Sequence, residues 1–296
     1  MDLNSCMLCP RKCKINRLKE VGFCKVKDKI KIARYSLHYF EEPCISLDKG
    51  SGTIFFSGCN LKCIYCQNYD ISTNNKGKEI SIEEFADICI KLQDAKALNI
   101  NLVTPTMYIP LIKEGLILAK KKGLKIPVVY NTSGYEEVDA LKELEGLIDI
   151  YLPDFKYYDD KLGQDFSLVS NYSFCTKKAI KEMYRQVGKP IIKDGLMKKG
   201  IIVRHLILPN HIDDSKKIIK YLYDTYKDNI YISIMNQYTP IRNIDKYEEL
   251  NRTLSEEEYD DVVNYACDLG ITKAFIQEGE TCKESFIPDF DVFEDI

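Results

Sequence analysis

The alternation of strand-like and helix-like segments constrains the fold of this chain most strongly. From Thr53 onward, short runs of β-branched residues alternate with segments whose apolar residues recur at helical spacing. Because a parallel strand needs a crossover, usually a helix, before the next one, this alternation predicts βαβ units and a parallel sheet. The predicted strands cover residues 53–57, 100–104, 126–130, 148–152, 201–208 and 230–235. We therefore expect an α/β fold, and 296 residues suffice for two domains or for one α/β barrel.

Capping signals mark where two of the helices begin. Ser81 and Ser255 are each followed three residues later by a glutamate, which is the capping box that opens many helices. Apolar residues recur at helical spacing behind both serines. Further helices are predicted over residues 108–122, 135–145, 172–187 and 214–226.

The chain has twelve cysteines, and seven of them form two groups. The N-terminus opens no signal peptide and no stretch approaches the roughly 20 apolar residues of a membrane span, so we expect a cytoplasmic protein without membrane attachment. In that compartment, grouped cysteines bind metal more often than they form disulfides. The first group is Cys6, Cys9, Cys13 and Cys24, and the second is Cys59, Cys63 and Cys66. The other five, which we expect in the core, are Cys44, Cys89, Cys175, Cys267 and Cys282.

The second group directly follows the first predicted strand. Cys59, Cys63 and Cys66 have the spacing C-x3-C-x2-C, which could place them on one face of a helix. Gly58 and the nearby asparagines favour a loop instead. A cubane 4Fe-4S cluster is normally held by four thiolates, so three cysteines leave one iron free to bind another group. This group is therefore the candidate catalytic set.

The first group offers four thiolates, which is a complete ligand set for tetrahedral zinc or for a second cubane cluster. Three interpretations remain open: a structural zinc, a second iron-sulfur cluster that relays electrons, and reduced thiols without a metal. We interpret residues 1–50 as a small Cys-rich N-terminal module, joined by a linker over 48–52 to the main domain. The main domain is expected over 51–280, followed by an acidic C-terminal tail over 281–296.

Basic residues are concentrated in the N-terminal module. Residues 11–34 hold ten Lys or Arg against Glu20 and Asp28, although the whole chain has a net charge of −3. Such a stretch fits an acidic partner or nucleic acid, but more often such charge belongs to a face that only contacts solvent.

The second cysteine group, with Tyr65 just before its last cysteine, resembles the signature of the radical S-adenosylmethionine (SAM) superfamily. The resemblance implies a partial (β/α)6 barrel and a 4Fe-4S cluster on Cys59, Cys63 and Cys66 whose open iron chelates SAM. Reductive cleavage of SAM would give methionine and a 5'-deoxyadenosyl radical that abstracts hydrogen from a substrate. An electron donor such as flavodoxin or ferredoxin is implied as well.

Several blocks resemble the subgroup related to the pyruvate formate-lyase activating enzyme. These blocks are residues 6–13, 41–43, 50–59, 131–135 and 203–206. This resemblance implies that the substrate is the glycine of a partner protein, a glycyl radical enzyme. Two alternatives stay open: a radical SAM enzyme that modifies a small molecule, peptide or RNA, and a non-catalytic iron-sulfur electron carrier or metal-binding regulator.

Polar residues at the carboxyl ends of the predicted strands are candidates for binding SAM, because ligands of parallel α/β sheets bind at those ends. The candidates are Asn131, Ser133, Asp154, Lys156 and Gln237. By resemblance, Asp154 and Lys156 match a D-x-K motif whose lysine reaches the SAM carboxylate.

Arg204 and His205 lie within one predicted strand, so their side chains point to opposite faces of the sheet. We expect Arg204 to face the inside of the barrel, because a guanidinium matches a carboxylate in shape and charge. By resemblance it corresponds to a basic residue on the fifth strand. His205 is expected to be hydrogen-bonded beneath a helix.

Overall fold

A computed structural model describes residues 3–277 and 288–296 of the chain. One eleven-stranded sheet organises these residues, in the order β10-β9-β8-β6-β5-β4-β2-β1-β11, with β3 paired to β1 and β7 to β8. From β2 to β10 in that order, neighbouring strands run parallel, whereas β1 is antiparallel to β2. The strands are β1 (Ile30–His38), β2 (Ser51–Phe56), β3 (Lys78–Ile80), β4 (Ile100–Val103), β5 (Val128–Thr132), β6 (Ile150–Pro153), β7 (Ile191–Lys193), β8 (Leu196–Leu206), β9 (Tyr231–Met235), β10 (Ala274–Ile276) and β11 (Glu294–Asp295).

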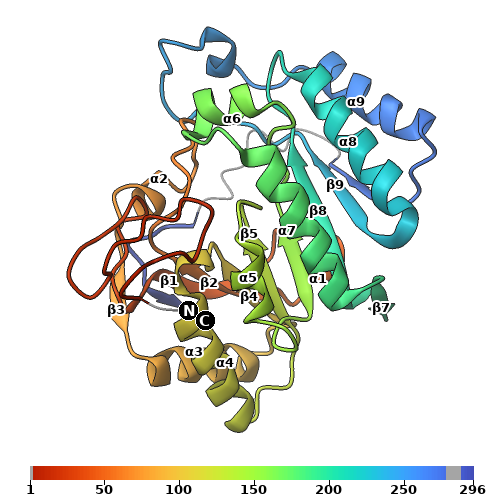
Figure 1. Cartoon of the computed structure of the whole chain (residues 1–296). Helices are drawn as coiled ribbons and strands as arrows, with labels where there is room; N and C mark the ends of the chain where they lie inside the picture. Colours follow the sequence, from red (N-terminus) through yellow and green to blue (C-terminus); the bar gives the residue numbers. More distant parts are fainter. Residues whose placement is uncertain (1–2, 278–287) are drawn as a thin grey trace.

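Helices lie between the strands along the chain, and all but α1 follow β2, the first of the parallel strands (Figure 1). They are α1 (Pro43–Ser46), α2 (Tyr69–Ser72), α3 (Ile82–Asp94), α4 (Ile109–Lys121), α5 (Val138–Lys142), α6 (Asp160–Ser167), α7 (Tyr172–Val187), α8 (Ile212–Tyr226) and α9 (Glu256–Asp268), with short 3-10 turns at Thr106–Tyr108, Lys227–Asn229 and Glu248–Asn251. Both predicted capping boxes are present, at Ser81 before α3 and at Ser255 before α9. The open parallel sheet with its crossover helices confirms the predicted α/β partial barrel.

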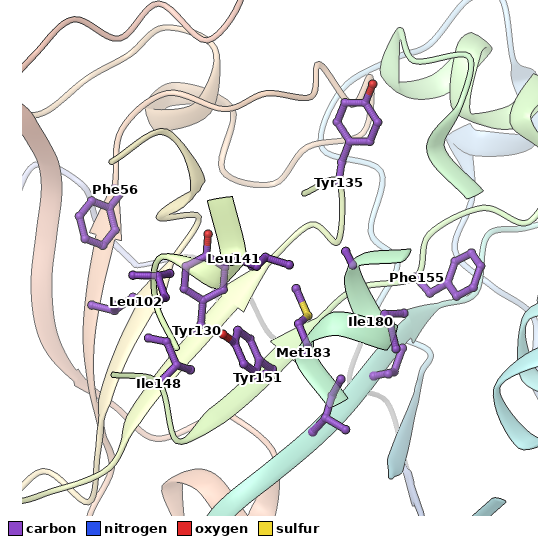
Figure 2. Close-up of a cluster of buried hydrophobic side chains, with 14 of the residues drawn as sticks. Phe56, Leu102, Tyr130, Tyr135, Leu141, Ile148, Tyr151, Phe155, Ile180 and Met183 are labelled. Carbon is purple, nitrogen blue, oxygen red and sulfur yellow. The ribbon is translucent and has the colours of Figure 1, made fainter. Parts of the chain in front are cut away.

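Alternate side chains of the parallel strands belong to two separate apolar cores. On one face of the sheet, Tyr130 and Tyr151 lie in the large core beneath the helices, beside Met183 of α7 (Figure 2). On the other face, a smaller core forms between the strands and the short helix α1, and its members include Val129, Ile150, Ile202, Cys44 and Ile45. Helix α1 therefore covers part of the inner face and leaves the carboxyl ends of the strands for a site.

Several predicted boundaries are wrong. Ser51 and Gly52, predicted in a linker, are buried residues of β2, and residues 30–38 form β1 of the same sheet. Within residues 3–50, the parts outside the sheet are therefore 3–29 and 39–50, on either side of β1. The strand predicted over 126–130 starts at Val128, after Pro127, which has no N–H to donate to a ladder.

The described end of the acidic tail lies along the edge of the sheet. β11 pairs with β1, and Arg34 of β1 forms an ion pair with Asp295. Phe290 and Phe293 pack edge-on against Phe55 and Tyr35, each at a ring-centroid distance of 5.5 Å. Across 3–277 and 288–296, none of the helices has the length and apolar character that crossing a membrane requires.

Candidate functional site

The second cysteine group lies on an irregular loop between β2 and α2, so the alternative of a shared helix face is wrong. The chain leaves β2 through Gly58, whose φ is +81°. A Cβ atom on Gly58 would lie 2.5 Å from Cγ2 of Val26 and 2.7 Å from the carbonyl oxygen of Cys24, so only glycine fits there. The loop is held by backbone bonds from Gly58 N–H to the carbonyl of Ile71 and from Ile64 N–H to that of Phe166.

The three thiols of this loop line one cavity of about 260 Å³. Cys63 Sγ accepts a hydrogen bond of 2.9 Å from Ser167 Oγ, and Cys59 Sγ accepts one of 3.4 Å from the N–H of Leu61. Burial raises the pKa of Cys59 to about 12, and it also raises the pKa of Cys63. These two thiols are therefore neutral at pH 7 unless a metal replaces their protons.

An ion-pair network lies on another wall of the cavity and links three strands. Arg204 of β8 contacts Asp154, directly after β6, with 2.9 Å between Nε and Oδ1. Lys156 Nζ lies 2.7 Å from the other carboxylate oxygen of Asp154. Arg204 also donates a bond of 2.6 Å to Asn131 Oδ1 of β5 and lies 3.4 Å from Glu41 Oε2.

The network keeps its charges in spite of burial. Burial acts to raise the pKa of Asp154, but Arg204 and Lys156 outweigh it and hold that pKa below its ordinary value. Burial acts to lower the pKa of Lys156, but the Asp154 carboxylate outweighs it and raises that pKa. The cavity therefore presents two fixed cations, which can receive a carboxylate ligand.

All six residues predicted to bind SAM line this cavity: Asn131, Ser133, Asp154, Lys156, Arg204 and Gln237. The hydroxyl of Ser133 is buried and has no hydrogen-bond partner among the described residues. Such a group lacks a partner that a polar ligand can supply. Gln237, after β9, accepts a bond of 3.4 Å from the side-chain amide of Gln277.

His205 points away from the cavity, as expected for the residue next to Arg204. Its side chain is buried, and Nδ1 is bonded at 2.8 Å to the carbonyl oxygen of Phe155. Burial lowers the pKa of His205 to about 4, so the ring is neutral at pH 7.

Sequence reasoning assigned no role to Glu41 and Ser167, although both contact the site. Glu41 accepts bonds from Asn101 and Asn131 at 2.7 and 3.4 Å in addition to its contact with Arg204. Glu41 precedes Glu42 and Pro43 in the sequence, and this acidic pair before a short core helix was the available signal. Ser167 ends α6, far from the loop in sequence, so no local pattern pointed to it.

The four cysteines of the first group line a second, small cavity of about 20 Å³, which Asn60 of the loop also borders. Arg11, between these cysteines, donates a bond of 2.9 Å to the carbonyl oxygen of Asn60. Among the described residues, no three His, Cys, Asp or Glu side chains are gathered as a site for one metal ion. This holds for both cysteine groups, so a metal at either of them stays a prediction.

The scattered cysteines divide between core and surface. Cys44, Cys89 and Cys175 are buried, as expected. The expectation is wrong for Cys267, which is exposed because the buried face of α9 is formed by other residues, among them Val262 and Ala266. Cys282 lies outside the described residues.

Comparisons with known proteins agree with this geometry. Residues 53–222 match the Radical SAM superfamily. The chain is 34% identical over 271 residues to the uncharacterized protein MJ0674 of Methanocaldococcus jannaschii, which covers 88% of this chain and 74% of that protein. It is 28% identical over 212 residues to the pyruvate formate-lyase-activating enzyme of Clostridium pasteurianum, with coverage of 67% and 79%.

One solved structure shows the same fold. The crystal structure of Streptococcus suis SuiB bound to S-adenosylmethionine superimposes with a TM-score of 0.50 at 13% identity, over 80% of this chain. This chain spans 55% of SuiB, and at that identity the likeness concerns the fold alone.

Proposed function

Since the chain belongs to the radical SAM superfamily, whose members use a 4Fe-4S cluster and SAM, we propose that it cleaves SAM reductively to a 5'-deoxyadenosyl radical. The radical then abstracts a hydrogen atom from a substrate. One observation carries this proposal: three thiols and a buried pair of cations line the same cavity.

The residues present fit both groups. Cys59, Cys63 and Cys66 offer soft thiolate ligands for three irons, and within residues 3–277 and 288–296 no fourth cysteine lines their cavity. When bound, the cluster supplies the electron that breaks the sulfonium bond, and the cytoplasmic donor of that electron is a flavodoxin or ferredoxin.

The chain's own residues orient SAM. Lys156 and Arg204 receive its carboxylate, and Asp154 holds both cations in position through contacts of 2.7 and 2.9 Å. Asn131, Ser133 and Gln237 offer amide and hydroxyl groups to the ribose and adenine.

We further propose that the substrate is the glycine of a partner protein. The similarity to an enzyme named for activating pyruvate formate-lyase supports this choice. The reaction would leave 5'-deoxyadenosine and a glycyl radical on the partner.

The first experiment tests SAM cleavage. The protein is purified without oxygen, loaded with iron and sulfide, reduced with dithionite in the presence of SAM, and analysed for 5'-deoxyadenosine. Wild type should form it, Cys63→Ala should not, and Cys267→Ala should behave as wild type because this thiol is exposed and outside the cavity. A fully loaded wild type that forms no 5'-deoxyadenosine would refute the proposal.

The second experiment tests the substrate. The loaded protein is mixed with a glycyl radical enzyme of the same organism, and the radical is sought by electron paramagnetic resonance. A glycine-centred signal that depends on SAM supports the activase function. If SAM is cleaved but no such signal forms, the glycine assignment fails while SAM cleavage stands.

SAM binding tests the proposed role of Lys156. Lys156→Met removes a buried cation, so the affinity for SAM should fall by about 1.5 to 3 kcal/mol, the usual value of a hydrogen bond to a charged group. Lys161→Met, at an exposed position of α6, is the control and should bind SAM normally. Equilibrium dialysis with labelled SAM makes the comparison, and equal affinities of the two variants would exclude this role.

A further inference from the structure

We infer that Cys6, Cys9, Cys13 and Cys24 hold a four-thiolate metal centre of negative charge, and that the buried Arg17 is its counter-charge. The inference concerns a site apart from the SAM cavity and does not depend on SAM cleavage. It rests on the surroundings of Arg17, on the shared cavity, and on the charge that such a centre carries.

Arg17 is a buried cation without an anionic partner among the described residues. Its side chain is 1% exposed. Nη1 donates a bond of 2.6 Å to the carbonyl oxygen of Met107, and Nη2 bonds the carbonyl oxygen of Lys27. Nε has no partner, and within residues 3–277 and 288–296 no carboxylate forms an ion pair with this guanidinium. Burying an unpaired charge is costly, so the fold needs a negative charge nearby.

Among the described residues that line this cavity, only the thiols can become anionic. Arg17 lines the cavity of about 20 Å³ together with all four cysteines of the first group. Glu136, a buried carboxyl group that acts electrostatically on Cys9, is already bonded by the hydroxyls of Thr106, Thr132 and Tyr130. The missing anion must therefore come from the cysteines or from what they bind.

The loops that carry these cysteines are tightly built. Lys12, Lys14 and Lys25 all have positive φ, a conformation that non-glycine residues keep only when their surroundings enforce it. Cys6 N–H bonds the carbonyl of Ile15 at 2.9 Å, and Lys14 N–H returns a bond of 2.9 Å to the carbonyl of Cys6. The cysteines are thus presented from fixed turns rather than from a loose segment.

A metal on four thiolates supplies the missing charge. Four thiolates on Zn²⁺ carry a total charge of about −2, and four thiolates on an oxidised cubane cluster also carry about −2. Both centres belong to the same ligand class, and both would meet the charge of Arg17. The fold places this charge beside the catalytic loop, since Arg11 of the same segment bonds the Asn60 carbonyl.

Metal analysis of one variant separates this site from the catalytic loop. The full chain with Cys59, Cys63 and Cys66 all changed to Ala is purified without oxygen, and zinc, iron and sulfide are measured. About one zinc per chain identifies a zinc site, and about four irons with sulfide identify a cluster. A variant that retains neither metal overturns the inference, whatever the result for SAM cleavage in the wild type.

Substitution of Arg17 tests its role as counter-charge. In that three-alanine background, Arg17→Met should weaken metal retention against a chelator by about 10- to 100-fold, the usual effect of residues that support metal ligands. Arg17→Lys keeps the positive charge, so it should retain metal much better than Arg17→Met does. Arg34→Met is the matched control, because it removes another buried arginine whose partner is Asp295. Metal retention by Arg17→Met equal to that of Arg34→Met would overturn the role of Arg17.

A further measurement covers the case in which Arg17→Met folds poorly. Thermal unfolding of Arg17→Lys and of the parent is compared with and without bound metal. Removal of the metal leaves a buried cation unpaired in both, so it should lower the melting temperature of both proteins. No change in either protein on metal removal would contradict the inference.

Discussion

At the scale of single residues, Ser167 is positioned to adjust the cluster that we propose on Cys59, Cys63 and Cys66. Its hydroxyl donates to Cys63 Sγ at 2.9 Å and is bonded in turn to the hydroxyl of Tyr157 at 2.8 Å. Hydrogen bonds to cluster sulfurs stabilise the more negative, reduced state and thereby raise the reduction potential. The cysteine spacing indicates Cys63 as a candidate ligand. No local pattern indicates Ser167, because its contact with Cys63 joins residues 104 positions apart.

Ser167→Ala should therefore make the reduction potential of the catalytic cluster more negative by roughly 20 to 60 mV, the equivalent of about one hydrogen bond. A potential titration followed by electron paramagnetic resonance measures the shift. Ser173→Ala is the control, since its buried hydroxyl has no partner among the described residues. Equal potentials for wild type and Ser167→Ala would show that the hydroxyl does not act on the cluster.

Glu136 gives the stability of the fold a pH dependence. Burial raises the pKa of this carboxyl from 4.5 to about 7, in spite of hydrogen bonds from Thr106, Thr132 and Tyr130. The folded state therefore holds a proton that the unfolded state releases between pH 4.5 and 7. The stabilisation is complete below pH 4.5 and is lost as the pH rises through 7.

Glu136→Gln has no carboxyl group to deprotonate, so its stability should not fall in this way. The free energy of unfolding of the variant, relative to that of wild type, should rise by roughly 2 to 3 kcal/mol between pH 5 and pH 8. Urea unfolding at several pH values measures the difference. The control is Glu143→Gln, at a half-exposed position where the Lys113 side chain keeps the carboxyl pKa low. A constant difference between Glu136→Gln and wild type across this range would contradict the assignment.

At the scale of secondary-structure elements, local signals predicted the helices and most of the parallel strands. The capping boxes at Ser81 and Ser255 could be located because each is complete within four residues. β1 was missed because its buried residues acquire their role only beside β2, and β5 was displaced because Pro127 sets its start. Register and pairing depend on contacts between distant segments, which a single sequence does not display.

The turn between β2 and the catalytic loop was recognised as a loop from Gly58, and the structure explains why glycine is needed. Gly58→Ala would place a Cβ atom 2.5 Å from Val26 and 2.7 Å from the Cys24 carbonyl oxygen. It should therefore lower the free energy of unfolding by roughly 2 to 4 kcal/mol and reduce the amount of iron that the loop binds. Gly146→Ala is the matched control, because Gly146 has φ +78° but no atom within 4 Å of the added Cβ. Gly146→Ala should lower the free energy of unfolding by only about 1 kcal/mol. Equal unfolding free energies for the two variants would show that the contacts with Val26 and Cys24 can relax.

At the scale of the whole molecule, the sequence located the site but not its surroundings. The cysteine spacing and the polar strand ends indicated residues that the fold brings to one cavity. Glu41 reaches Arg204 across 163 positions, and no pattern within either segment indicates this contact. The acidic tail was likewise predicted from its composition, whereas its described part is bound to β1.

The last described segment should therefore stabilise the whole sheet. A chain that lacks residues 288–296 leaves the buried Arg34 without Asp295 and without its bond of 2.7 Å to the Asp289 carbonyl, and it uncovers Phe55 and Tyr35. A buried charge without its partner destabilises the folded state. The free energy of unfolding, measured in urea, should therefore fall by at least about 3 kcal/mol. Asp291→Ala is the control, because its ion pair with Lys76 is exposed and should contribute at most about 1 kcal/mol. If the shortened chain unfolds at the same urea concentration as Asp291→Ala, residues 288–296 contact the sheet without stabilising it.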